Sequence, residues 1–102
     1  MSTGVYAEQR HQALKLANAV RIDRARLKRR IKAGEITAAQ VILDPPSAAL
    51  GWAVVDVLVA QRQWGAVKAR RLLRSVEIGE HRAVGSLTNR QRTDLAGRLR
   101  QR

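Results

Sequence analysis

The amino-acid sequence predicts an all-α protein in which a long basic N-terminal helix is followed by a small helical domain. Residues 7–33 contain neither Pro nor Gly, which permits one uninterrupted helix. Apolar residues make up 45% of the chain, but only 3% are aromatic and Phe is absent, so we expect an aliphatic core. The Val-rich segment 52–60 has no second β-like run to pair with, so we expect it to be helical too. A length of 102 residues suits one domain with an arm.

The first helix is expected from about Ala7 to Ala33, with Gly34 as its left-handed C-cap. An apolar stripe at helical spacing consists of Ala13, Leu16, Val20, Leu27 and Ile31. A basic ridge beside the stripe consists of Arg10, Arg21, Lys28 and Lys32. Seven of the twelve residues from Arg21 to Lys32 are cationic, which favours an anionic partner, although a merely solvated face is the alternative.

A short helix should follow this long one. The segment 37–43 is typical of a two-turn helix in which Thr37 and Gln40 form a capping box. Pro45 and Pro46 then end it, because neither has a backbone N–H. We therefore predict an N-terminal helical arm over residues 1–44 and a second domain over residues 45–102. Ser47 is expected to begin the next turn.

The C-terminal domain is expected to contain three helices. The first is the buried run 52–60, and the second covers residues 66–76 and is closed by Gly79. The third begins at a capping box formed by Thr88 and Gln91. The side chains expected to point inward are Ala69, Leu72, Leu73, Val76, Leu95 and Leu99. The arginines expected to face solvent or a polyanion are Arg70, Arg71, Arg74, Arg90, Arg92, Arg98, Arg100 and Arg102.

The charge of the chain indicates the kind of partner. Twenty Lys and Arg against eight Asp and Glu give a formal net charge of +12 and a pI near 11.8. Such an excess repels itself and favours binding to nucleic acid. Sixteen of the twenty cations are Arg, whose planar guanidinium suits phosphates and base edges.

The sequence contains few residues that would support catalysis, metal binding or membrane insertion. There is no Cys, and His11 and His81 lie far apart without a carboxylate cluster, so we expect no metal and no cofactor. Asp56 and Asp94 are lone carboxylates, so we expect no enzyme. No signal-like or membrane-spanning run is present, so we expect a cytoplasmic protein that does not contact membranes.

Two helix starts are the best candidates for contacts to phosphate. Backbone N–H groups at the start of a helix lack internal partners, and the positive end of the helix dipole favours anions. Gly65 and Thr88 mark these starts, and Lys68 lies one turn beyond the first. We expect the two starts to lie side by side and to hold the backbone of one double helix.

Several short segments, spread over nearly the whole chain, follow one another in the order of a known protein family. They are Glu8-Gln9-Arg10, Lys32-Ala33-Gly34, Gln40-Val41-Ile42-Leu43, Leu50-Gly51, Trp64-Gly65-Ala66-Val67-Lys68-Ala69, Glu77-Ile78 and Asn89-Arg90-Gln91-Arg92. This order resembles the actinobacterial integration host factor family of the mycobacterial and Streptomyces type. The resemblance implies a helix-two-turns-helix domain, a fold shared with ribosomal protein S13.

What the resemblance implies about function is a nucleoid-associated, non-enzymatic protein. It would bind double-stranded DNA with little sequence preference, bend or compact it, and assist integrase at phage attachment sites. The residues expected to contact DNA are Arg62, Gln63, Trp64, Gly65, Lys68, Arg71, Arg82, Ser86, Thr88 and Arg90. The chain departs from the family at Gln63, where many relatives have Gly, and at Ala66, where they have Lys. The family's loop before the last helix carries three arginines, of which this chain keeps only Arg82. Arg82 is our candidate for insertion into a DNA groove.

A second DNA surface is a further hypothesis, because it would let one monomer touch two duplex segments. Its residues would be Arg21, Arg24, Lys28, Lys32, Arg70 and Arg74. Trp52, amid Val and Leu, is expected to pack in the core, whereas Trp64 could pack or stack on bases.

Two other functions stay open. Net charge does not distinguish DNA from RNA, so an RNA-binding module like ribosomal protein S13 is one alternative. The apolar stripe of the first helix would also suit a protein-binding regulator that antagonises a related host factor.

Overall fold

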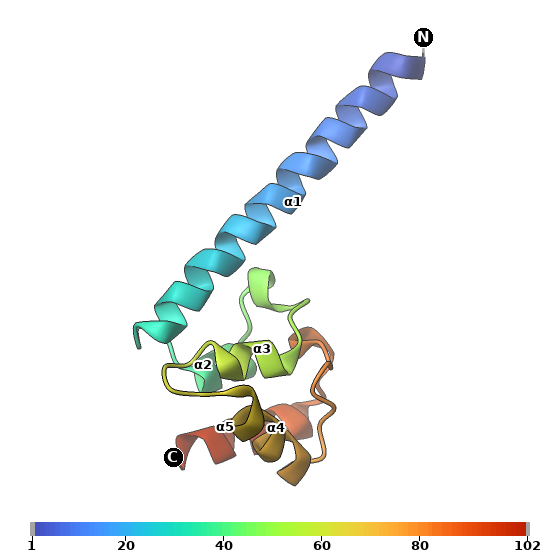
Figure 1. Cartoon of the computed structure of the whole chain (residues 1–102). Helices are drawn as coiled ribbons and strands as arrows, with labels where there is room; N and C mark the ends of the chain where they lie inside the picture. The colour runs from blue at the N-terminus through green and yellow to red at the C-terminus, as the bar shows by residue number, and fades with distance from the viewer. Residues whose placement is uncertain (1, 102) are drawn as a thin grey trace.

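The computed structural model describes residues 2–101, with side chains from residue 7 onward. The described chain is helical throughout, which confirms the all-α prediction (Figure 1). The elements are α1 (Ser2–Lys32), α2 (Ala38–Leu43), the 3-10 turn η1 (Ser47–Ala49), α3 (Val54–Val59), α4 (Ala66–Ser75), the 3-10 turn η2 (Val84–Ser86) and α5 (Asn89–Arg100). Extended pairing within residues 2–101 is limited to an isolated bridge between Ala53 and Ala83.

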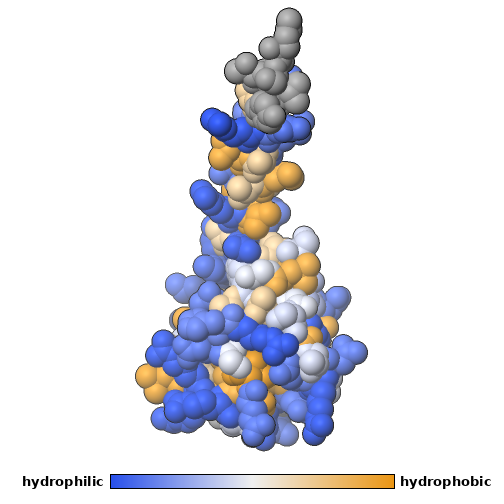
Figure 2. Space-filling model, turned by 90° about the vertical axis from the view of Figure 1, so that its right-hand side faces the viewer, coloured by the Kyte–Doolittle hydropathy of each residue, from blue (hydrophilic) through white to orange (hydrophobic). Residues whose placement is uncertain are grey.

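Helix α1 projects from a small helical domain, so the molecule is elongated, with extents of 59 × 27 × 23 Å (Figure 1). Every residue from 7 to 23 is exposed. Figure 2 shows hydrophobic and hydrophilic side chains mixed along this projecting part. Within residues 2–101, no helix combines the length and apolar character needed to cross a membrane.

The last turns of α1 anchor it to the domain. Leu27 and Ile31 are buried, and α1 packs against η1. The Nε atom of Arg24 donates to the carbonyl oxygen of Ala48 at 3.1 Å. The predicted apolar stripe is therefore buried only in this C-terminal half, because Leu16 and Val20 are 68% and 41% exposed.

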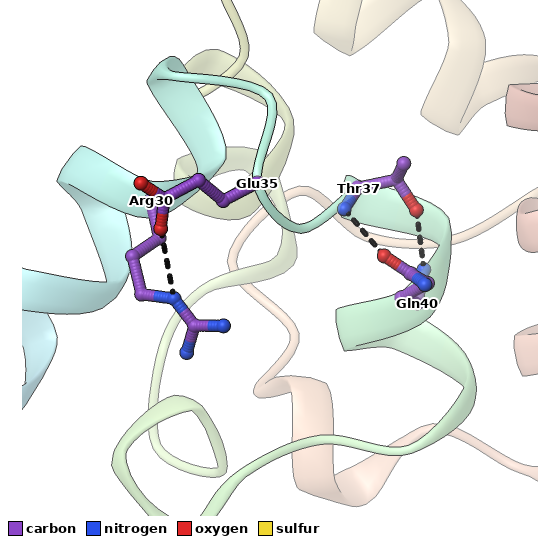
Figure 3. A network of polar contacts seen from close by, with 4 residues as sticks. All are labelled: Arg30, Glu35, Thr37 and Gln40. Atoms are coloured by element: carbon purple, nitrogen blue, oxygen red, sulfur yellow. Dashed lines mark hydrogen bonds and ion pairs between the residues drawn. The ribbon is translucent and has the colours of Figure 1, made fainter.

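Helix α1 ends where the sequence predicts. Gly34 has a φ of +80°, its N–H donates to Ile31, and the N–H of Glu35 donates to Arg30. This is a Schellman motif, and an ion pair of 3.4 Å between Arg30 and Glu35 spans it (Figure 3).

A capping box then begins α2, as predicted. The N–H of Gln40 donates to Thr37 Oγ1 at 3.0 Å, and the N–H of Thr37 donates to Gln40 Oε1 at 2.8 Å (Figure 3). Two local motifs, the Schellman motif and the capping box, thus end α1 and begin α2.

Helix α2 lies in the core of the domain, packed on α5 and α3. Ile42 of α2 is fully buried together with Leu58, Leu73 and Leu95 from the three later helices. This packing joins α2 to the C-terminal helices. We therefore propose that the arm is α1 alone, rather than residues 1–44.

The Val-rich segment forms helix α3, as predicted, although the helix begins only at Val54. Trp52 is buried, as expected, and Trp52 and Ala53 are not part of the helix. The N–H of Val54 donates to Arg82 and the N–H of Val84 donates to Trp52, each at 2.8 Å. These bonds fasten the loop 80–87 to the start of α3.

The predicted span of α4 is confirmed to within one residue, but its predicted closing residue is wrong. Helix α4 ends at Ser75, and Glu77, not Gly79, has the left-handed conformation, with a φ of 58°. The N–H of Ile78 donates to Leu73 and that of Glu77 to Arg74, which is again a Schellman motif. Because Ile78 is buried there, its burial offsets the strain at Glu77.

The predicted exposure of Arg92 is also wrong. Its Nη1 atom donates to the carbonyl of Ile42 at 2.7 Å, and its Nη2 atom donates to Val84 and Leu87 at 3.1 Å each. The last carbonyls of a helix lack internal partners, and those of α2 obtain one here. Arg92 therefore links α2, η2 and α5.

Replacement of Arg92 by Met should lower the free energy of unfolding by about 2–4 kcal/mol, because three carbonyls lose a charged donor. Urea denaturation followed by circular dichroism measures this loss. Arg98→Met, at an exposed position of the same helix, is the matched control and should cost less than about 0.5 kcal/mol. Equal losses for the two variants would show that Arg92 has no structural role.

Candidate nucleic-acid interface

The start of α4 is open to an external anion. Gly65 is its N-cap, and no side chain caps the helix there. The N–H groups of the first turn therefore have no partner within the helix. A Cβ at Gly65 would meet no atom within 4 Å, and its φ of −94° is accessible to any residue. A Cβ at this position would therefore point into open space, where an incoming molecule could meet it.

Trp64 and Lys68 form a pair beside this helix start. Trp64 is half-buried and packs against the core. The Nζ atom of Lys68 lies 4.3 Å from the centroid of the Trp64 ring, within cation–π range. This contact holds the ammonium near the first turn of α4.

The start of α5 is partly closed. Thr88 Oγ1 accepts the N–H of Gln91 at 3.1 Å, and Gln91 Oε1 accepts the N–H of Thr88 at 3.0 Å. The predicted capping box is thus confirmed, and it occupies two donors that would otherwise face a phosphate. The N–H groups of Asn89 and Arg90 remain at this end of the helix axis. That the starts of α4 and α5 lie side by side stays a prediction.

In the loop before α5, the side chain of Arg82 binds Ser86 of the same loop. The Nε of Arg82 donates to Ser86 Oγ at 3.1 Å, and its Nη2 donates to the Ser86 carbonyl at 2.8 Å. Ser86 Oγ in turn donates to the carbonyl of Ala83 at 2.8 Å. The structure therefore joins two of the predicted DNA contacts, Arg82 and Ser86, to each other.

The other predicted contact residues are Arg62, Gln63, Arg71 and Arg90, and all four are exposed. Gln63 adopts a left-handed φ of 69°, a conformation that Gly tolerates far better. The family pattern that the sequence resembles implies Gly at this position, and this departure is the sequence signal for the strain.

The predicted second surface contains residues with different roles. Arg24 binds the Ala48 carbonyl, and Arg70 forms a 3.0 Å ion pair with Glu80. Lys28 lies 5.4 Å from the centroid of the Trp52 ring. Arg21, Lys32 and Arg74 are exposed and have no ion pair among residues 7–101. Three of the six cations thus already have contacts within the protein.

In the described part of the chain, no three His, Cys, Asp or Glu side chains gather where a metal ion could bind. The arrangement instead combines a strongly basic helical domain, an open helix start and an adjacent Lys. Fold and site together define a basic helical protein of the helix-two-turns-helix class, with a projecting arm.

Comparisons with known proteins agree with this class. The chain is 40% identical over 90 residues to the integration host factor of Mycobacterium tuberculosis and 39% identical to that of Mycolicibacterium smegmatis, with 86% of both chains aligned in each case. No protein-family model matches it. A solved structure of sIHF bound to an 8-base-pair palindromic DNA superposes with a TM-score of 0.74 at 25% identity, covering 83% of this chain and 98% of that one. The chain belongs to the integration host factor family of these mycobacterial proteins.

The strain at Gln63 gives a direct prediction. Gln63→Gly should raise the free energy of unfolding by about 1 kcal/mol, because Gly adopts a positive φ without the steric cost of a Cβ. Gln63→Ala is the matched control and should bring no gain, since Ala retains that Cβ. Thermal denaturation of the three proteins measures the difference. A gain of the same size in the Ala variant would assign the effect to the lost side chain and not to the backbone.

Proposed function

We propose that the protein binds double-stranded DNA in the bacterial nucleoid, with little sequence preference, and bends it. The observation that carries the proposal is the open start of α4 beside Lys68, on a chain with a formal charge of +12. Family membership supports it, because the related sIHF was solved with DNA bound.

Affinity in this proposal comes mainly from phosphates. The N–H groups of the first turn of α4 donate to phosphate oxygens, and the Lys68 ammonium adds a charge-assisted contact. The exposed side chains Arg62, Arg71 and Arg90 neutralise neighbouring phosphates. None of these contacts reads a base edge, so sequence preference is weak.

Bending in this proposal depends on Arg82. Its guanidinium gives up its hydrogen bonds to Ser86 and enters a narrowed minor groove of the DNA, where the negative potential is strongest. The bonds to Ser86 are lost in this exchange, so insertion is favoured only where the DNA deforms easily. The protein would therefore select deformable sites in preference to particular sequences.

Compaction requires a second contact. We assign it to the exposed ridge residues Arg21, Lys28 and Lys32 and to Arg74, without Arg24 and Arg70, which bind within the protein. A monomer with two such surfaces could join two duplex segments, and it could assist integrase by holding an attachment site bent.

Binding to duplex DNA should weaken steeply with salt, by about 10³- to 10⁵-fold between 50 and 200 mM if about six to ten phosphates are engaged. Fluorescence anisotropy with a duplex of arbitrary sequence measures the slope. A shallow slope would contradict binding through phosphates. Structured RNA that displaces the duplex at lower concentration than unlabelled duplex does would favour the RNA-binding alternative instead.

Arg82→Ala should reduce DNA bending while lowering affinity less than about tenfold, because one phosphate or groove contact among many is lost. Energy transfer between dyes at the two ends of a short duplex measures the bend. Arg98→Ala is the matched control, because it removes one exposed arginine on α5, outside the loop of Arg82. It should leave the bend unchanged. An unchanged bend in the Arg82 variant would remove Arg82 from the bending mechanism.

A further inference from the structure

A groove of about 520 Å³ lies between the last turn of α1 and the end of α3. Its cationic residues are Lys28, Arg29 and Lys32 from α1 and Arg62 from the turn after α3. None of these four has an ion pair among residues 7–101. The groove therefore gathers four positive charges that form no ion pair within residues 7–101.

The floor of the groove is apolar. Val59 is 39% exposed there, and Ala60 lies beside it. A bare phosphate would gain nothing from this floor, whereas a ligand with a flat ring could cover it. The floor thus favours an anion that also carries an apolar surface.

The size of the groove favours a small molecule. The α1 residues that line it span a single turn, from Lys28 to Lys32, or about 6 Å along the axis. A docked partner helix would need several turns of contact. The volume falls instead in the range of small-molecule sites, roughly 300–1,000 Å³.

One carboxylate, Asp56, also lines the groove. A carboxylate repels phosphates but accepts hydrogen bonds from N–H groups. Guanine presents two such donors next to each other, N1–H and the N2 amino group, which one carboxylate can accept together. In duplex DNA both take part in base pairing, so a duplex does not offer them, whereas an unpaired guanine nucleotide does.

We propose that this groove binds a free guanine nucleotide with two or more phosphates. The phosphates bind the four cations, the ring covers Val59 and Ala60, and the base edge donates to Asp56. Lys28 is already held near this position by its contact with the Trp52 ring. Lys68 and Gly65 at the open start of α4 do not line this groove. Arg62, Lys28 and Lys32 belong both to the groove and to the DNA contacts proposed above, so a nucleotide and a duplex would compete for these side chains.

Isothermal titration calorimetry of the full chain with guanosine diphosphate tests the proposal. Binding should be at least about tenfold tighter than for guanosine or for inorganic pyrophosphate, because each lacks one half of the recognised chemistry. Equal binding of pyrophosphate would reduce the groove to an unspecific basic patch, and absence of binding would overturn the proposal.

Two matched comparisons assign the binding to the groove. Lys32→Glu should weaken guanosine diphosphate about tenfold or more, whereas Lys15→Glu, the same charge change on the exposed arm, should alter it less than about twofold. Asp56→Asn should shift preference from guanosine to xanthosine diphosphate, because an amide N–H suits the xanthine oxygen that replaces the N2 amino group. Unchanged base preference in the Asn variant would overturn the role of Asp56.

A third measurement separates this site from the DNA interface. Lys68→Ala should weaken duplex binding but leave binding of guanosine diphosphate within about twofold, since Lys68 does not line the groove. If the Lys32→Glu variant loses duplex affinity while guanosine diphosphate never binds, the groove belongs to the DNA footprint and the proposal fails.

Discussion

Hydrogen bonds from arginine to backbone carbonyls fasten several elements of this structure around its aliphatic core. With twenty cations and eight carboxylates, the chain does not have enough acids to pair its arginines. Three of them bind main-chain oxygens instead: Arg24 fixes the arm to η1, Arg82 closes its own loop, and Arg92 links α2, η2 and α5. A carbonyl satisfies the donors of the guanidinium without removing its charge. The protein is thus stabilised by the same residues that maintain its attraction for polyanions.

The elements set by neighbouring residues could be predicted from the sequence. Gly34 and the capping boxes at Thr37 and Thr88 act within a few residues, so their patterns are visible in the chain. The end of α4 could not be predicted in this way. Burial of Ile78 against the rest of the core decides it, and Glu77 accepts the strained conformation as a result. Arg92 was missed because one of its acceptors, the Ile42 carbonyl, becomes a neighbour only after α2 and α5 have packed.

The candidate interface was predictable in composition but not in detail. The sequence indicated a phosphate contact at both helix starts, Gly65 and Thr88. In the structure the two starts differ in how their backbone N–H groups are capped. The same capping box that allowed α5 to be predicted occupies its donors, whereas the absence of a capping side chain leaves α4 open. A side chain that stabilises a helix start in the absence of ligand therefore competes with the ligand. For this reason our proposal places the phosphate at the start of α4, which has no capping side chain.

The left-handed Gln63 connects the two sites. Gly would adopt this φ at no steric cost, so the Gln side chain is kept at an expense of about 1 kcal/mol. Gln63 lines the groove between α1 and α3, and two residues later Gly65 begins the open helix start. Strained residues persist where the surrounding structure fixes them, and they cluster at binding sites. An amide side chain at this junction can donate to a phosphate or accept from a base, which a Gly could not do. In the proposal of a nucleotide in this groove, such a contact would offset the backbone strain at Gln63.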